Sequence, residues 1–428
     1  MKNAHIISIG NELLIGDTIN TNASWIGTFL TELGFYVEQV FTIPDSYKLI
    51  QNRINESLET AAITIVTGGL GPTHDDITKK AVADLFGVEM MQDERVLMHI
   101  KSLFEKRNFT FSKSNADQAL IPVGAQVLFN NKGTAPGMWM SKGKNYLAML
   151  PGVPYEMKFL MENRVKPKVE EHFPGLDSWA TQYFKTAGVP ESTLSDRVGN
   201  LDEFEKNGVA VAYLPSAAGV TIRISSSGRE KRAAEGKLVQ LRETLYEKIG
   251  GLIYGEGKNL TLPEVVGELL AERNLTIAVA ESCTGGHLAN SLTDIPGSSR
   301  YLHGGVVAYA DQVKRSHLGV LENELKGYGA VSKSVALQMA KAAAENFETD
   351  IGVSTTGIAG PTGGTEEKPV GTVWMGFWMN GNHFALKAVL TNDRLINKER
   401  TVMVVLETIR RQLKGIDGFP YQLKPQYS

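Results

Sequence analysis

The sequence predicts an α/β protein with three parts: a doubly wound N-terminal domain, a small α+β module and a C-terminal α/β domain. Short apolar runs alternate with amphipathic helical patterns through the first part. The expected strands cover residues 5–9, 36–42 and 62–67, and the expected helices cover 20–33 and 47–60. Strands separated by helices of this length form a parallel sheet with helices on both faces. The chain of 428 residues is also too long for one ordinary core.

Turn-forming residues divide the chain into these parts. Pro174 and Gly175 lie in a predicted linker, and the glycine-containing segment 254–257 marks a second boundary. We therefore expect a domain over 1–170, a module over 176–255 and a domain over 258–415. The expected strands after the first boundary cover 179–187, 209–214, 220–225, 276–280, 305–309, 351–356, 372–379 and 384–390. The expected helices there cover 191–198, 229–249, 262–273 and 395–413.

The charge balance argues against some classes of partner. The chain has 44 basic and 47 acidic residues, a formal net charge of −3, and no basic cluster, so we expect no nucleic acid as partner. The single cysteine, Cys283, excludes an internal disulfide and is typical of a reducing compartment. The N-terminus lacks the pattern of a signal peptide, and no window is apolar enough for a membrane helix. We therefore expect a cytoplasmic protein without a membrane partner.

A glycine-rich loop follows the strand predicted at 62–67 and precedes a helix. Glycines let the backbone approach a ligand, and free N–H groups at the start of a helix favour an anion such as phosphate. Asp75 and Asp76 offer the oxygen ligands that Mg²⁺ prefers, although aspartates at this place are also ordinary helix caps. The expected ligand-binding residues are Gly68, Gly69, Gly71 and Thr73, with Glu12 at the end of the first strand.

The C-terminal domain carries hydroxyl side chains, a tyrosine and a lysine among glycine turns. No His/Asp pair lies near the serines, so a Ser–Lys or Ser–Tyr–Lys arrangement fits an amide hydrolase better than a Ser–His–Asp triad. Glycine turns would supply N–H donors for an oxyanion. The candidate residues are Ser282, Thr284, Ser298, Ser299, Tyr309, Lys314 and Thr356.

Each of these residues also has a simpler interpretation. Ser282 and Thr284 are typical helix caps, and Lys314 is typical of a solvated charge. Cys283 and His287 are four residues apart on one helical face, so a Cys–His nucleophile is a further alternative. A lone cysteine, however, is more often a small buried apolar side chain.

Several N-terminal segments resemble motifs of the molybdopterin-binding-like domain of CinA proteins: 10–14, 68–76, 133–137 and 150–154. The resemblance implies a pyrophosphatase that splits ADP-ribose into AMP and ribose 5-phosphate with a divalent metal ion of the Mg, Mn or Co type. It implies Asp76 as the first candidate for a metal or phosphate-side residue. Asp75, Glu12 and Glu156 are the next candidates. Molybdopterin binding or a degenerate site is the alternative, because molybdenum-cofactor enzymes share this fold.

Residues 179–255 resemble the KH-type insert of the same family. RNA-binding KH domains need a GXXG loop, which is missing between the helical segments here, so a spacer or dimerisation element is expected. The family resemblance suggests a homodimer. A competence-related binding role without catalysis is a further hypothesis, which the lack of basic clusters with interleaved aromatic residues disfavours.

The C-terminal segments 281–286, 297–299, 305–314, 356–361 and 366–373 are similar to the CinA C-terminal domain. This resemblance implies an amidase without a cofactor, which converts nicotinamide mononucleotide into nicotinate mononucleotide and ammonia. Carried over by motif, Ser299 is the nucleophile, and Lys314 and Tyr309 activate it. Relatives often carry Ser or Thr and then Asn after the tyrosine, where this chain has Ala310 and Asp311.

The same resemblance implies substrate contacts around this centre. Ser282 and Thr356, followed by Gly357, would help to hold the substrate or the oxyanion. Either Arg394 or Arg400 would pair with the substrate phosphate, because a guanidinium matches phosphate oxygens. The residues expected to face the anionic end of the substrate are Thr284, Gly285 and Gly286.

Overall fold

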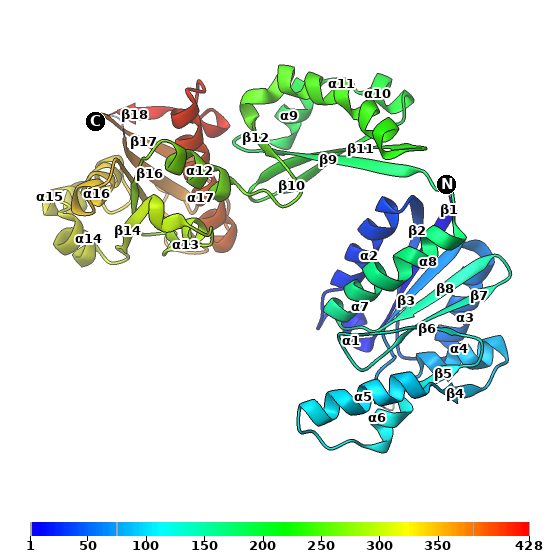
Figure 1. Cartoon of the computed structure of the whole chain (residues 1–428). Coiled ribbons are helices and arrows are strands. Elements are labelled where there is room, and N and C mark those ends of the chain that lie inside the picture. The colour runs from blue at the N-terminus through cyan, green and yellow to red at the C-terminus, as the bar shows by residue number, and fades with distance from the viewer. Residues whose placement is uncertain (1, 74–75, 380, 428) are drawn as a thin grey trace. The chain divides into compact units, whose positions relative to one another are not determined.

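The computed structural model describes residues 2–73, 76–379 and 381–427 (Figure 1). The backbone divides into two compact units. The first comprises Met1–Ala180 and Ser226–Gly236, and the second comprises Thr181–Ser225 and Lys237–Ser428. Most of the expected module 176–255 is therefore grouped with the C-terminal domain. No helix among the described residues is long and apolar enough to span a membrane.

The first unit is built on a six-stranded sheet of order β2-β1-β3-β8-β7-β6. Strands β1 (Lys2–Ile9), β2 (Phe35–Ile43), β3 (Ile63–Thr67) and β8 (Asn145–Leu150) are parallel, whereas β7 (Gly137–Lys142) and β6 (Gln126–Leu128) are antiparallel. A two-stranded sheet pairs β4 (Met90–Gln92) with β5 (Leu120–Pro122). The helices are α1 (Asn11–Leu14), α2 (Thr21–Glu32), α3 (Tyr47–Thr60), α4 (Thr78–Phe86), α5 (Glu94–Lys106), α6 (Lys113–Asp117), α7 (Pro154–Leu160), the π-helix η1 (Met161–Val165) and α8 (Lys166–His172).

Helices cover both faces of this sheet (Figure 1). Successive strand residues point to opposite faces, so Ile6 packs with α2 and α7 while Ile7 packs with α3 and α4. The doubly wound arrangement predicted from the alternating pattern is therefore confirmed for this unit. Its parallel strands end at one edge of the sheet, where ligands of such folds bind.

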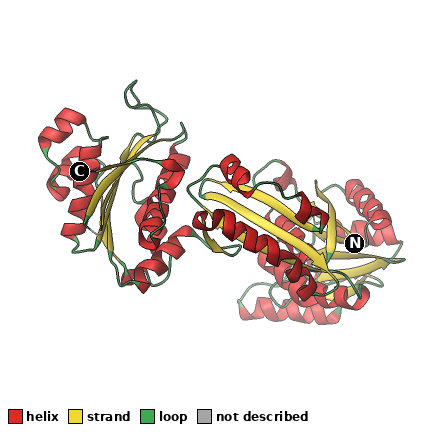
Figure 2. Ribbon diagram, turned by 90° about the horizontal axis from the view of Figure 1, so that it is seen from above, coloured by secondary structure: helices red, strands yellow, loops and turns green. Residues whose placement is uncertain are grey.

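The rest of the chain forms two further sheets, seen with their helices in Figure 2. The first has the order β10-β11-β9-β12 and comprises β9 (Ser178–Thr186), β10 (Val209–Ser216), β11 (Gly219–Gly228) and β12 (Ile253–Glu256). The helices that follow these strands are α9 (Glu191–Val198), α10 (Asp202–Lys206), α11 (Lys231–Ile249) and the 3-10 turn η2 (Gly250–Leu252). This is the small α+β module that the sequence predicts.

The C-terminal sheet has the order β14-β13-β15-β16-β17-β18. Strands β13 (Ile277–Glu281), β14 (Leu302–Val307) and β15 (Ile351–Gly357) are parallel, and β16 (Thr372–Met379), β17 (Asn382–Val389) and β18 (Pro425–Tyr427) continue the sheet in antiparallel order. Because β18 pairs with β17, the sheet extends beyond the boundary expected at residue 415. The helical segments are α12 (Leu262–Glu272), α13 (His287–Thr293), η3 (Ser298–Arg300), α14 (Asp311–Leu318), α15 (Glu322–Tyr328), α16 (Lys333–Asn346), α17 (Arg394–Lys414) and η4 (Pro420–Gln422).

A buried ion-pair network on α17 joins the module to this domain. The Glu407 carboxylate accepts bonds of 2.7 Å from both Arg410 Nε and Arg411 Nε, and all three side chains are buried. Arg410 Nη2 also donates to the Gly251 carbonyl at 2.7 Å. Since an unpaired buried charge is costly, each member of this network needs the others. The module and the domain therefore form one packed unit.

Candidate functional sites

The parallel strands of the C-terminal sheet end at a cavity of about 230 Å³, which we name the Ser282 cavity. Ser282 directly follows β13, Tyr309 follows β14, and Thr356 lies at the end of β15. Carboxyl ends of parallel strands meet at one edge, which is why residues far apart in the sequence converge here. The lining residues are Ser282, Cys283, Tyr309, Asp311, Lys314, Ala330, Val331, Thr356, Gly357, Ala359 and Arg394.

Lys314 forms a buried wall of the Ser282 cavity. It lies on α14 and its side chain is 1% exposed. The Nζ atom donates to the Tyr309 carbonyl at 3.2 Å and to the Asp311 carboxylate at 3.3 Å. A long flexible side chain is thereby held in one position. Asp311 is thus a direct partner of the amine.

Arg394 is the arginine of this cavity. Its Nη1 donates to the Gly360 carbonyl at 3.0 Å and its Nη2 to the Tyr309 hydroxyl at 2.6 Å. Arg394 is exposed at the start of α17, and Tyr309 is 60% exposed. Arg400 lines a different cavity. The sequence left Arg394 and Arg400 as alternatives, and of these two only Arg394 lines the Ser282 cavity.

The far wall of the cavity is a tightly held turn after β15. The Thr356 hydroxyl donates to the Ala330 carbonyl at 2.8 Å, and a side chain at Gly357 would come within 2.7 Å of the Thr372 carbonyl. Asn397 of α17 is buried, and its amide donates to the Ala359 carbonyl at 2.9 Å. Position 357 therefore requires glycine, and Asn397 of α17 holds the turn in place.

Glu281 is a functional-site residue that sequence reasoning missed. Its buried carboxylate accepts hydrogen bonds from the N–H groups of Gly286, Leu288 and Ala289 at 2.8–3.0 Å. It therefore occupies the start of α13, where acidic groups are favoured by the unpaired N–H groups. The sequence feature that could have identified this residue is a glutamate between an apolar strand and a glycine turn. The prediction that Gly286 faces an anionic substrate is wrong, because its N–H is already bonded.

Two neighbouring predictions also fail. Thr284 is fully buried, and its hydroxyl bonds that of Thr355 at 2.6 Å, so it does not face a ligand. The N–H of Gly285 donates to the Ser282 carbonyl at 3.1 Å. Gly285 is exposed but does not line the cavity. These residues shape the turn that presents Ser282 instead of binding the substrate.

Ser299 lies at the wrong edge of the sheet for a partner of Lys314. It belongs to η3, which precedes β14, whereas Tyr309 and Lys314 follow β14. The six residues of β14 separate these ends by roughly 20 Å at about 3.3 Å per residue. The structure therefore does not bring Ser299 and Lys314 of one chain together, and Ser299 does not line the Ser282 cavity. Ser282 lies at the same edge as Lys314 and lines the same cavity.

The Cys283 thiol is a poor nucleophile in this setting. Its pKa is raised to about 12, mainly by burial and also by the charge of Glu281, whereas its own backbone N–H, Thr355 and Lys314 oppose the shift. The thiolate, which is the reactive form, is therefore scarce at neutral pH. The structure favours the buried-residue interpretation over the Cys–His alternative.

The first unit holds a second candidate site at the carboxyl ends of β1, β3 and β8. This N-terminal cavity has a volume of about 440 Å³. Its carboxylates come from four separate segments, and glycine-loop backbone forms another side. The lining residues are Ile9, Gly10, Glu12, Asp45, Gly68, Gly69, Leu70, Gly71, Pro72, Asp76, Gln118, Thr134, Ala135, Pro151, Gly152, Val153 and Glu156.

The glycine loop after β3 has the backbone geometry that the sequence predicts. Gly68 and Gly69 have φ angles of +107° and +67°, which residues with side chains rarely adopt. A side chain at Gly68 would overlap the Ile9 carbonyl, and one at Gly71 would lie 2.6 Å from the Asp76 carboxylate. The backbone of the loop therefore lies directly against the cavity.

Asp76 is half-buried and oriented by the loop. Its Oδ2 accepts the Thr73 N–H at 2.9 Å and the Thr73 hydroxyl. Thr73 itself is exposed and does not line the cavity, so its predicted ligand contact becomes a supporting one. Asp75 lies outside the described residues. Glu12 is exposed at the cavity wall, as expected.

The donor set of the N-terminal cavity fits a divalent cation that is completed by phosphate oxygens. Within residues 2–73, 76–379 and 381–427, no three His, Cys, Asp or Glu side chains gather closely enough to hold an ion by themselves. Mg²⁺ commonly uses one or two carboxylates together with substrate phosphates and water. Asp76 keeps its Oδ1 free of the Thr73 bonds, and Glu12 and Glu156 line the same space.

Lys79 and Glu156 support this cavity from inside the fold. Burial lowers the pKa of Lys79 to about 8, and the charge of Asp76 partly opposes the shift. Its Nζ donates to the Asp117 and Gln118 carbonyls at 3.2 Å. Glu156 is buried and accepts from Asn130 Nδ2 at 2.6 Å. Sequence reasoning missed Lys79, for which no spacing signal existed.

Comparisons with known proteins agree with this architecture. The model described as "Probable molybdopterin binding domain" matches residues 5–171, "Damage-inducible protein CinA KH domain" matches 181–255, and "CinA C-terminal domain" matches 259–413. A CinA-like protein of Chloroherpeton thalassium is 42% identical over 420 residues, covering 96% of this chain and 99% of that relative.

Further relatives give the same result. A CinA-like protein of Salinibacter ruber is 41% identical over 411 residues, covering 96% of this chain and 99% of that relative. A crystal structure of the protein CinA from Thermoplasma acidophilum is 36% identical with a TM-score of 0.36, and the match covers 39% of this chain and 97% of that one. The identities of 42% and 41% over nearly the whole chain show that this chain belongs to the CinA family.

Proposed function

We propose that the C-terminal domain is an amidase that hydrolyses nicotinamide mononucleotide to nicotinate mononucleotide and ammonia. The observation that carries this proposal is the convergence of Ser282, Tyr309, Lys314 and Arg394 on one cavity. A hydroxyl, a buried amine, a phenol and a guanidinium are the groups that a Ser–Lys amidase with an anionic substrate needs.

The reaction starts at the Ser282 hydroxyl. In its neutral form, the Lys314 amine has a lone pair and takes the hydroxyl proton, directly or through the Tyr309 phenol. The Ser282 oxygen attacks the amide carbon and forms a tetrahedral intermediate. The C–N bond then breaks, ammonia leaves with the proton from the amine, and an acyl-enzyme remains. Water, deprotonated by the same amine, releases the carboxylate and restores Ser282.

The amide oxygen becomes an oxyanion that needs N–H donors. The N–H groups of Gly285 and Gly286 are bonded to Ser282 and Glu281, respectively. Cys283 and Thr284 directly follow Ser282, and their N–H groups form no backbone–backbone hydrogen bond within the described residues. We assign the oxyanion to this pair.

The cavity also suits the shape of the substrate. Its volume of about 230 Å³ is below the usual 300–1,000 Å³ of whole-ligand pockets. It therefore takes the nicotinamide ring with its amide, while the ribose phosphate extends outward. The exposed Arg394 at the mouth can then pair with the phosphate.

The test is ammonia release from nicotinamide mononucleotide by the purified full chain. Turnover should persist in excess EDTA, because no step of the mechanism uses a metal. A Lys314→Met variant should lose turnover and remain folded by circular dichroism. Absence of ammonia release by the wild-type chain, or undiminished turnover by this variant, contradicts the proposal.

We also propose that the N-terminal domain is a metal-dependent ADP-ribose pyrophosphatase. The carboxylates of Glu12, Asp76 and Glu156 beside the glycine loop favour this activity over pterin binding alone. These residues would hold a divalent cation, which neutralises charge on the pyrophosphate oxygens when it is bound. The loop amides bind phosphate, and Lys79 holds the Gln118 segment against the cavity.

This second activity has its own assay. AMP should appear from ADP-ribose with Mg²⁺, Mn²⁺ or Co²⁺, disappear with EDTA, and fall at least about 100-fold in an Asp76→Ala variant. Ammonia release should be unchanged in that variant, because Asp76 belongs to the other unit. AMP formation that resists both EDTA and this substitution contradicts the proposal, and a metal-loaded chain that forms no AMP leaves pterin binding as the better interpretation.

A further inference from the structure

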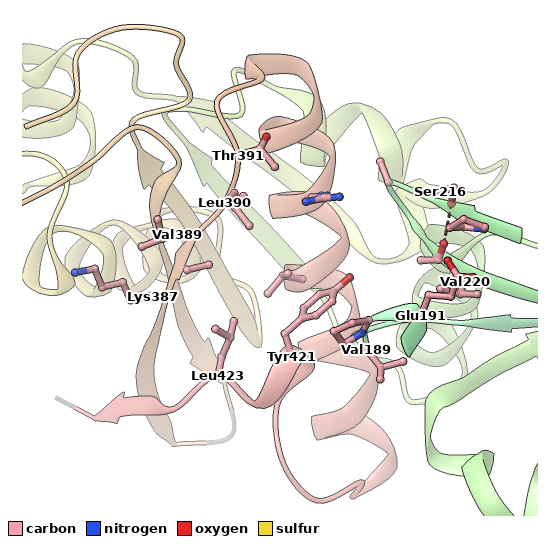
Figure 3. Close-up of a pocket in the computed structure, with 17 residues that line it drawn as sticks. Val189, Glu191, Ser216, Val220, Lys387, Val389, Leu390, Thr391, Tyr421 and Leu423 are labelled. Atoms are coloured by element: carbon pink, nitrogen blue, oxygen red, sulfur yellow. Dashed lines mark hydrogen bonds between the residues drawn. The ribbon is translucent and has the colours of Figure 1, made fainter. Parts of the chain in front are cut away.

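The second unit contains a larger cavity that the amidase does not use. This seam cavity has a volume of about 560 Å³ and lies between the module and α17 with its neighbouring strand β17 (Figure 3). The module contributes residues 189–191 and the turn between β10 and β11. Volumes of 300–1,000 Å³ at the junction of two folded parts are typical of small-molecule sites. The seam cavity therefore has the size and place of a ligand site.

One side of the seam cavity is aromatic and apolar. Figure 3 shows the Tyr421 side chain beside Val189, and Val404 and Leu423 line the same space. The Tyr421 backbone has φ +52°, a conformation that a residue with a side chain rarely adopts. Its N–H donates to the Gly188 carbonyl at 2.6 Å, which holds it there. Strained backbone of this kind is concentrated at ligand-binding sites.

A guanidinium without a protein partner completes the cavity. Arg400 lines it from α17, is exposed, and forms neither a hydrogen bond nor an ion pair with the rest of the described chain. Burial raises the pKa of Tyr421, and the Arg400 charge opposes this shift, so the two side chains are neighbours. Lys387 also lines the cavity, but its amine points away from Tyr421 in Figure 3. Arg400 is thus the cation that shares the seam cavity with Tyr421.

The module contributes a carboxylate to the same cavity. Glu191 lines the cavity from the start of α9 and has no ion-pair partner among the residues that the structure describes. Carboxylates accept hydrogen bonds from ribose hydroxyls in nucleotide-binding folds. An anion-binding group, an aromatic face and a hydroxyl acceptor therefore surround one space.

We propose that the seam cavity binds a nucleoside monophosphate, with its phosphate on Arg400, its base against Tyr421 and its ribose hydroxyls on Glu191. The guanidinium forms paired hydrogen bonds with phosphate oxygens, and the aromatic ring and aliphatic walls accept a flat heterocycle. This site is separate from both catalytic cavities and does not depend on either proposed activity.

Photolabelling of the full chain with 2-azido-AMP, followed by peptide mapping, locates the site directly. We expect labelled peptides that contain Val189 or Tyr421, and we expect unlabelled AMP to compete for them. Arg400→Ala should weaken labelling of these peptides about 10-fold, because a charge-assisted phosphate contact is lost. Lys414→Ala removes one exposed positive charge from the same helix outside the cavity, and it should leave the labelling of these peptides unchanged.

A second variant tests the ribose contact. Glu191→Ala should weaken competition by AMP more than competition by 2′,3′-dideoxy-AMP, which lacks the hydroxyls. Labelling confined to the N-terminal cavity or the Ser282 cavity overturns the proposal, as does seam labelling that Arg400→Ala leaves unchanged. The proposal is also overturned if two copies of the chain associate through the seam cavity, if Arg400→Ala separates them, and if AMP does not bind. A second copy of the chain would then be the occupant.

Discussion

Arg394 and Tyr309 are joined by a 2.6 Å hydrogen bond from the guanidinium Nη2 to the phenol oxygen. The bond connects the first residue of α17 to the segment after β14, at the mouth of the Ser282 cavity. One side chain thus lines the cavity and also orients the phenol. A cation beside a phenol also favours the orientation in which the phenol oxygen accepts a hydrogen bond.

Loss of Arg394 should therefore affect substrate binding more than chemistry. We expect Arg394→Ala to raise KM for nicotinamide mononucleotide by about 10–100-fold, the equivalent of one charge-assisted contact. Arg394→Lys should recover part of this loss, because it keeps the charge without the paired geometry. Steady-state kinetics measure KM for each variant, and Lys414→Ala controls for the loss of one positive charge from the same helix. A KM that stays within twofold of the wild-type value would show that the phosphate lies elsewhere.

Ser282 and Ser299 form a matched pair of variants. Ser282→Ala should reduce kcat by at least about 10³-fold, because removing a nucleophile leaves only binding and oxyanion stabilisation. Ser299→Ala should retain wild-type kinetics, because Ser299 is exposed at the opposite edge of the sheet. Ammonia release under saturating substrate distinguishes the two. The reverse pattern would restore the motif-based assignment and remove Ser282 from the mechanism.

Cys283 should be almost inert toward thiol reagents. With a pKa of about 12, its thiolate fraction at pH 8 is lower than that of a free cysteine by about 10³-fold. Alkylation of the native chain at pH 8 should be slower by a similar factor, and denaturation should restore the normal rate. Cys283→Ala should keep kcat within about 10-fold of wild type, whereas a true nucleophile would lose far more.

The sequence could predict which strand ends meet, because parallel strands bring their carboxyl ends to one edge. This rule accounts for the meeting of Ser282, Tyr309 and Thr356, since each follows or ends a parallel strand. The same rule separates Ser299 from this site, because Ser299 precedes β14. The order of motifs along the chain does not show whether a motif precedes or follows its strand. The rule was available in the sequence, but Ser299 was assigned from the motif resemblance and not from its position relative to a strand.

Helical geometry could have separated the two arginines. Arg394 and Arg400 are six residues apart on α17, which at about 100° per residue places them roughly 120° apart around the helix. Only one of them could face a given cavity. Lys79 and Gln118, by contrast, meet because a connecting segment folds back over α4. No local pattern records such long-range packing.

Lys79 gives a pH dependence of stability with a defined sign. Its pKa is about 8 in the folded chain and 10.5 unfolded, so the unfolded state binds more protons between these values. Stability should therefore rise with pH across this window, by ~3 kcal/mol at most. Calorimetry of the wild type against Lys79→Met should show this rise as a relative Tm gain of roughly 5–10 °C. A pH-independent difference between the two would show that Lys79 titrates normally.

Glu281 should stabilise the turn that carries Ser282. Its carboxylate accepts three N–H groups at the start of α13 from a position that is 1% exposed, so Glu281→Ala leaves these donors unpaired in the interior. We expect a loss of about 2–4 kcal/mol, seen as a lower Tm of the C-terminal transition. Glu281→Gln should also be destabilised, because its NH₂ group would face N–H donors.

Glu268 supplies the control for this prediction. It lies on α12, is exposed and carries the same charge, so Glu268→Ala should shift Tm by no more than a surface substitution does. The Glu281 variants should also lose ammonia release below their melting temperature, because the turn after β13 sets the position of the Ser282 hydroxyl. If Glu281→Ala melts and turns over like wild type, the start of α13 has another partner and can accept an anionic ligand after all.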